Sequence, residues 1–205
     1  MSTDHLRRNI QRCVLVTVAC LATSAAFAQR GAMTVPRNLE QMVSRSADIV
    51  RGSVLSARVE KHPELENLDT LVVTLKLHDT IKGSAQGTYS FRQYIWDIRD
   101  RNDLAGYHKG QEYILLINPP SRYGLTSPAG MEQGRFRVVR DGSGRELAVN
   151  GRANTFLMRG VAGELAKSGA VLSKDSSALV AKHQKGPIPV NDLVRLMREL
   201  ARTGG

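Results

Sequence analysis

Aromatic and basic side chains alternate along the segment 88–96, Thr-Tyr-Ser-Phe-Arg-Gln-Tyr-Ile-Trp. On a β-strand, successive side chains face opposite sides. One side would carry Tyr89, Phe91 and Ile95 inward, and the other would carry Arg92, Tyr94 and Trp96 toward solvent. Aromatic rings beside an arginine bind extended ligands by stacking and charge, so we expect a ligand-binding face here. Alternatively, the loop 119–133 or the C-terminal helix covers these rings as a second small core.

Two long loops adjoin this strand and add candidate binding residues. The loop 97–108 contributes Arg99 and His108, and the loop 119–133 contributes Tyr123. Both loops are longer than a simple connection requires, and long loops commonly carry binding residues.

The run 97–103, Asp-Ile-Arg-Asp-Arg-Asn-Asp, contains enough oxygen atoms to suggest calcium. Arg99 and Arg101, however, stand where a calcium loop places further oxygen ligands, and no glutamate follows at the required interval. We interpret this run as a loop neutralised by its own ion pairs, and we expect no metal there.

The mature sequence contains no recognisable catalytic motif. Its four histidines form no H-x-x-x-H or H-x-H pair that would hold zinc. A G-x-S-x-G elbow and a phosphate-binding glycine loop are also missing. The sequence therefore favours a non-enzymatic binding or scaffolding domain without a cofactor. Two rivals stay open: a hydrolase using Asp97, Asp100 and His108 as acid and base, and a protease inhibitor that inserts the loop 119–133.

Residues 1–28 have the pattern of a secretory signal peptide. Three arginines between residues 7 and 12 precede a short apolar run, and small residues follow up to Ala28. A basic start, an apolar middle and an A-x-A end are the features that the export machinery and signal peptidase recognise. The apolar run is shorter than the about 20 residues of a spanning helix. We therefore expect cleavage after Ala28, no transmembrane segment afterwards, and a location in the periplasm or outside the cell.

Charge and cysteine content limit the partners and the chemistry. The chain has 29 Lys and Arg against 19 Asp and Glu, and it would keep a net charge of about +8 after cleavage. Nucleic acid is not expected outside the cytoplasm, so an unknown protein or an anionic envelope component is the expected partner. Both cysteines lie in the leader, which excludes thiol catalysis and cysteine–zinc sites in the mature chain.

Hydrophobic periodicity predicts mostly strands, with one amphipathic helix near each end. Strands are expected at 49–60, 70–80, 88–96, 112–117, 135–140 and 146–149, and helices at 39–47 and 190–203. The run 112–117 is apolar enough to be a central strand covered on both faces. Gly52 suggests a bulge, and Asp141-Gly-Ser-Gly suggests a hairpin turn. Asn38 with Gln41 would cap the first helix reciprocally, and Asn191 would cap the last one.

These elements suggest the following organisation: a flexible lead (29–38), a β-barrel domain (39–156), a strap or linker poor in aromatic residues (157–189), and a C-terminal helix (190–203). The expected fold is mainly β, a small OB-like barrel of five to six strands. A β-sandwich is the alternative.

Three segments resemble netrin-like domains, which are OB-type barrels: Ser46–Val54, Leu75–Gly83 and Gly110–Leu116. The segment 123–136 is similar to one shared by a group of exported bacterial proteins without an established activity. The resemblance implies a fold and no function. Metalloproteinase inhibitors of the netrin-like type chelate the protease metal through an amino-terminal cysteine, and this mature chain has no cysteine to do so.

Overall fold

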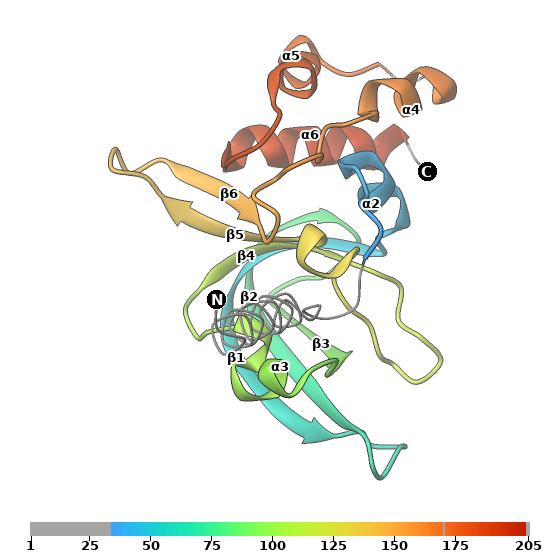
Figure 1. The fold of residues 1–205 in the computed structure, drawn as a ribbon, viewed down its shortest axis with the longest axis vertical. Coiled ribbons are helices and arrows are strands. Elements are labelled where there is room, and N and C mark those ends of the chain that lie inside the picture. Colours follow the sequence, from blue (N-terminus) through green and yellow to red (C-terminus); the bar gives the residue numbers. More distant parts are fainter. Residues whose placement is uncertain (1–33, 170, 204–205) are drawn as a thin grey trace, which may run out of the picture. The chain divides into compact units, whose positions relative to one another are not determined.

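Seven strands form one antiparallel sheet in the order β3-β2-β1-β4-β5-β6-β7 (Figure 1). The structure is a computed structural model that describes residues 34–169 and 171–203, so the expected signal peptide at 1–28 lies outside the described residues. The strands are β1 (Asp48–Lys61), β2 (Asp69–Lys82), β3 (Thr88–Tyr94), β4 (Glu112–Ile117), β5 (Arg135–Arg140), β6 (Glu146–Asn150) and β7 (Ile188–Pro189). The mainly-β class is confirmed.

The hairpin of β1 and β2 is the longest pairing, with 14 residues in each strand. Its register shifts at three places, one of them between Arg51 and Gly52. A Cβ atom at Gly52 would lie 2.5 Å from the backbone oxygen of Lys76. The bulge predicted at Gly52 is therefore confirmed, and the close approach of the two backbones explains why glycine occupies it.

The central strand β4 is covered on both faces, as its sequence predicts. Ile114 and Leu116 face one hydrophobic core, whereas Tyr113 and Leu115 face another. Since side chains alternate along a strand, a continuous apolar run is what burial on both faces requires.

The two cores differ in what covers the sheet. The first, here called the sheet core, lies within the curled half of the sheet formed by β1 to β4. Its buried members are Val50, Val54, Leu71, Val73, Leu75, Phe91, Tyr107, Tyr113, Leu115 and Ile117. The second, here called the helix core, lies between the opposite face and a layer of helices, and includes Leu39, Phe136, Leu157 and Leu196.

The helix layer contains α2 (Leu39–Arg45), α4 (Val161–Ser168), α5 (Lys174–Lys182) and α6 (Val190–Thr203). Helix α6 lies between the sheet and the pair α4 and α5 (Figure 1). The reciprocal cap of α2 is confirmed, because Asn38 accepts from the Gln41 backbone at 2.9 Å and Gln41 accepts from the Asn38 backbone at 3.3 Å. The cap predicted for Asn191 is wrong: α6 begins at Val190, so Asn191 is already inside its first turn.

The predicted five- to six-stranded barrel is wrong, and so is the two-sheet sandwich. The described strands form a single open sheet whose end strands, β3 and β7, do not pair with each other. On its β1 side, strand β4 pairs with no more than the first half of β1, at Asp48–Ser53. The strands after β4 extend the sheet under α6 because the apolar face of that helix needs a sheet surface to cover it.

The segment 118–128 fills part of the opening between β3 and β4. One isolated bridge joins Leu125 to Arg92 on β3, and another joins Pro128 to Ile117 on β4. A loop therefore covers the sheet core where a closed barrel would have a strand.

Two segments that carry little sequence pattern are packed against this framework. Within 157–189, Val161 and Leu165 of α4 are buried in the helix core. In the described part of the lead, the backbone N–H of Arg37 donates to the side chain of Gln133 at 2.9 Å. Among the described residues, none of the helices combines the length and hydropathy needed to span a lipid bilayer.

Candidate functional site

The alternation predicted for the aromatic strand is present in β3. Phe91 is buried in the sheet core, whereas Tyr94 is 41% exposed and Trp96 is 55% exposed. Trp96 lies two residues beyond the end of the strand, which is shorter than predicted. The two exposed rings nevertheless meet edge to face, with centroids 4.9 Å apart. Ile98, at the start of α3 (Ile98–Asn102), is 66% exposed.

Arg92 is fixed by the neighbouring hairpin. Its guanidinium donates to the Thr70 hydroxyl at 2.5 Å, to the Glu60 carboxylate at 3.1 Å and to the Lys61 carbonyl at 3.3 Å. Tyr94 lies opposite Thr70 in the β2–β3 register. Arg92 therefore borders the aromatic pair, but part of its charge is already satisfied by Glu60.

Arg99 is likewise paired within the protein. Asp97 caps α3, accepting from the Arg99 backbone at 2.8 Å and from its guanidinium. Those bonds, the guanidinium bond foremost, lower the pKa of Asp97 to about 2. Arg101 pairs with Asp69 and so ties α3 to the start of β2. The predicted pairing of this loop with itself is confirmed for Asp97 and Arg99.

Tyr123 is placed by a histidine that sequence analysis did not select. The His62 ring is buried; its Nδ1 accepts from the Glu64 backbone at 3.1 Å, which leaves Nε2 to donate to the Tyr123 carbonyl at 2.8 Å. The backbone of Thr126 donates to the Arg92 carbonyl at 2.8 Å. The loop tip is thus attached both to the β1–β2 hairpin and to β3. No sequence motif marks His62, because its partner is a backbone atom 61 positions away.

His108 stands apart from these residues. It is exposed, and its ring lies 3.6 Å from the Asp103 carboxylate. Among residues 34–169 and 171–203, no hydrogen bond, ion pair or aromatic contact joins His108 to Trp96, Asp97 or Asp100. The structure therefore attaches Arg92, Tyr94 and Tyr123 to the β1–β2 hairpin. Trp96 contacts Tyr94, Arg99 pairs with Asp97, and His108 pairs with Asp103 instead of with any of these residues.

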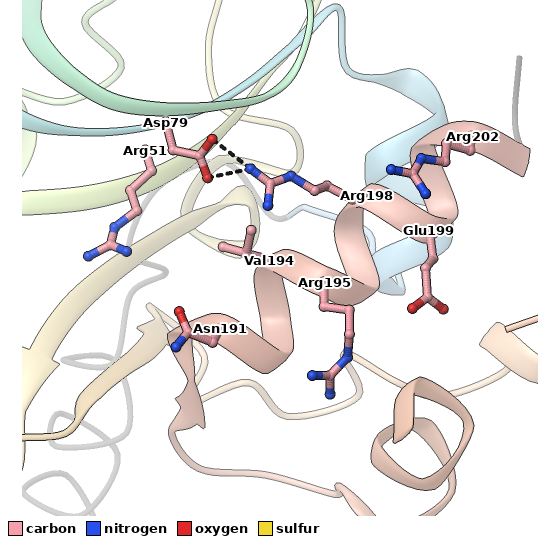
Figure 2. Close-up of a pocket in the computed structure, with 8 residues that line it drawn as sticks. All are labelled: Arg51, Asp79, Asn191, Val194, Arg195, Arg198, Glu199 and Arg202. Carbon is pink, nitrogen blue, oxygen red and sulfur yellow. Dashed lines mark hydrogen bonds and ion pairs between the residues drawn. The ribbon is translucent and has the colours of Figure 1, made fainter. Parts of the chain in front are cut away.

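An arginine-rich groove of about 390 Å³ runs between α6 and the sheet (Figure 2). Its lining residues are Arg51, Asp79, Asn191, Val194, Arg195, Arg198, Glu199 and Arg202. The sequence predicts three of these arginines, Arg195, Arg198 and Arg202, on the outer side of the last helix; this is wrong for Arg198, which bonds to Asp79 of the sheet.

Three of the four arginines of this groove, Arg51, Arg195 and Arg198, are paired with carboxylates of the described chain. Arg198 donates twice to Asp79, at 2.7 and 2.8 Å, as the dashed lines of Figure 2 show. Arg51 bonds to Glu112 at 2.5 Å and to Glu146 at 2.7 Å. These pairs join α6, β1, β2, β4 and β6, so we interpret the groove as part of the framework and not as an anion site.

The comparisons leave the family of this chain open: a scan against models of known protein families and a search of curated proteins both found no match. In the part of the chain that the structure describes, no group of three or more His, Cys, Asp and Glu side chains is placed to hold a metal ion.

Proposed function

We propose that this chain is an exported, non-enzymatic binding domain of the cell envelope. Its binding surface, here called the aromatic face, consists of Tyr94, Trp96 and Ile98 with the bordering Arg92 and Arg99. The observation that carries the proposal is that three large apolar side chains, spaced two residues apart, stay exposed at the end of β3. Exposed aromatic residues of this kind are enriched at binding surfaces.

The surroundings of the aromatic face favour a protein partner over an anionic polymer. The two arginines beside the rings already bond to Glu60 and Asp97, whereas the apolar surface of the rings has no such compensation. An apolar centre within a polar, charge-paired rim is the usual composition of a protein–protein interface. Binding of an anionic envelope component would instead need cations whose charge is not already paired.

Export rests on the leader pattern at residues 1–28. Intact mass measurement of the chain purified from its own envelope tests it. A protein that begins at Gln29 supports export and cleavage after Ala28. A chain that retains residue 1 would contradict cleavage.

A distant relation to netrin-like domains is also proposed. Its support is that the three segments carrying the resemblance contribute to β1, β2 and β4, which are neighbours around the sheet core. The proposed relation is limited to strands β1 to β4, because netrin-like domains are closed barrels and the whole sheet of this chain is open.

The two rivals gain no geometric support. For the hydrolase, Asp97 is bonded to Arg99 and His108 is paired with Asp103. For the inhibitor, the tip of the loop is closed by a turn in which the Ser121 backbone donates to the Leu125 carbonyl at 2.8 Å. An inhibitory loop that occupies a protease cleft needs an extended segment there instead.

The decisive experiment replaces both rings of the aromatic face. Tyr94→Ala combined with Trp96→Ala should reduce retention of the mature chain on envelope fractions at least tenfold, because exposed aromatic anchors dominate interface energies. Leu55→Ala is the matched control: Leu55 is an exposed apolar residue on β1, and its loss should leave retention unchanged. Equal retention of the double variant and the control would contradict the proposal.

The class of partner is tested separately by placing a photocrosslinking amino acid at position 98. Crosslinks to a protein that disappear in the Tyr94→Ala, Trp96→Ala background support a protein partner. Retention that is abolished by moderate salt, without any protein crosslink, would instead indicate an anionic component.

A further inference from the structure

A second pocket lies on the helix side of the molecule, between the turn-rich segment 151–160 and the end of α5. It is open to solvent on one side and has a volume of about 460 Å³, a size typical of small-molecule sites. Its described lining residues are Thr155, Phe156, Met158, Arg159, Val180, His183, Gln184 and Lys185. None of them belongs to the aromatic face, and the sequence analysis assigned none of them to a site.

Phe156 holds an unusual backbone conformation at the pocket. Its φ is 63°, in the left-handed region that bulky side chains rarely adopt, and its side chain is 50% exposed. The Arg159 guanidinium lies 5.5 Å from the centre of its ring. A strained backbone that presents an aromatic ring to solvent contributes little to the core, and such strain is concentrated at binding sites.

His183 supplies a polar atom without a partner. Its Nε2 has almost no solvent exposure and makes no hydrogen bond with any described residue. Burial lowers the pKa of His183, which favours the neutral ring near pH 7. Because Nε2 is not exposed, a ligand cannot reach it as the ring is placed, and the ring contributes only an uncharged surface to the pocket.

The cationic side chains around this pocket have no carboxylate partner among the described residues, unlike most of those in the arginine-rich groove. Arg159 and Lys185 are the cationic lining residues, and no carboxylate occurs among the described lining residues. Neither cation forms an ion pair with a described residue. Met158 and Val180 provide an apolar wall beside the Phe156 ring. The pocket thus combines an apolar wall with a cationic rim.

We infer that this pocket binds a small amphipathic carboxylate, a molecule with an apolar body and a single carboxylate group. The apolar body would contact Phe156, Met158 and Val180. The carboxylate would lie between Arg159 and Lys185, where a guanidinium provides paired donors for it. The site is independent of the aromatic face.

The test uses 3-phenylpropionate and its neutral analogue 3-phenylpropanamide with the mature chain. Binding is followed by the chemical shifts of the His183 ring and the Gln184 side-chain amide. We expect the carboxylate to shift both signals in a saturable manner and to bind at least tenfold more tightly than the amide. Equal affinity for the two probes, or shifts confined to other residues, would overturn the inference.

Two variants assign the roles within the pocket. Lys185→Gln should weaken binding of 3-phenylpropionate at least threefold, whereas Lys109→Gln, which removes an exposed charge from another loop, should not change it. Phe156→Gly should weaken binding at least fivefold while the urea midpoint of unfolding stays equal or rises, because glycine adopts a positive φ without strain. Unchanged binding in both pocket variants would refute the site.

Discussion

Asn150 and Asn154 bond to each other reciprocally across a tight turn. The Asn154 side-chain oxygen accepts from the Asn150 backbone at 2.9 Å, and the Asn150 side-chain oxygen accepts from the Asn154 backbone at 2.8 Å. Asn154 is fully buried, and its amide nitrogen also donates to the carbonyls of Ala148 and Gly186, at 2.9 and 2.8 Å. This pair fixes the end of β6 and the turn that carries Phe156, so the pocket depends on it.

Asn154→Ala should therefore destabilise the fold by about 3 kcal/mol, because it leaves buried backbone groups without partners and places alanine at a φ of 56°. Urea unfolding monitored by circular dichroism measures the loss. Asn191→Ala, at an exposed position on α6, is the control and should change the free energy of unfolding by less than about 0.5 kcal/mol. Similar effects of the two substitutions would contradict the role of the pair.

Gly52→Ala should cost about 2 kcal/mol, because its new methyl group would collide with the backbone of β2. The colliding atom is the Lys76 oxygen, 2.5 Å from the ideal Cβ position. Gly142→Ala is the matched control, since nothing lies within 4 Å of its Cβ position. Chemical denaturation of both variants checks the prediction, and a Gly52→Ala protein as stable as the control would rule out the close approach.

Asp97 should titrate near pH 2, below its ordinary pKa of 3.8. Because the pKa is lower in the folded chain, the Asp97 contribution to stability is fully present above about pH 4 and is lost as the pH falls toward 2. Carboxyl ¹³C NMR titration measures the midpoint. In Arg99→Ala, which keeps the backbone bond and removes the guanidinium, the midpoint should rise toward 3.8. An identical midpoint in both proteins would exclude the pairing.

Trp96 is the only tryptophan of the chain, so its fluorescence reports on the aromatic face alone. Because its side chain is 55% exposed, the free protein should emit near the maximum of solvated tryptophan. Addition of the envelope partner should shift the emission to shorter wavelengths. A maximum already blue-shifted in the isolated protein would show that the rings are covered, as in the alternative of a second small core.

Local features of the fold were predictable from the sequence. The alternation in β2 and β3, the apolar run of β4 and the reciprocal cap at Asn38 each depend on neighbours within a few residues, so periodicity and spacing reveal them. Helices α4 and α5 were not predicted, because their sequences are rich in Ser, Lys and Ala and carry few apolar positions. These two helices are positioned by packing their few apolar side chains against the helix core.

In the candidate sites, too, some features follow from the local sequence and others from tertiary contacts. The sequence by itself determined which side chains of β3 leave the sheet core, because a strand alternates its side chains strictly. Only the tertiary structure decided that Arg92 is paired with Glu60, that the sheet stays open, and that Phe156 and His183 line one pocket. These outcomes depend on contacts between residues far apart in the chain, and no local pattern encodes such contacts.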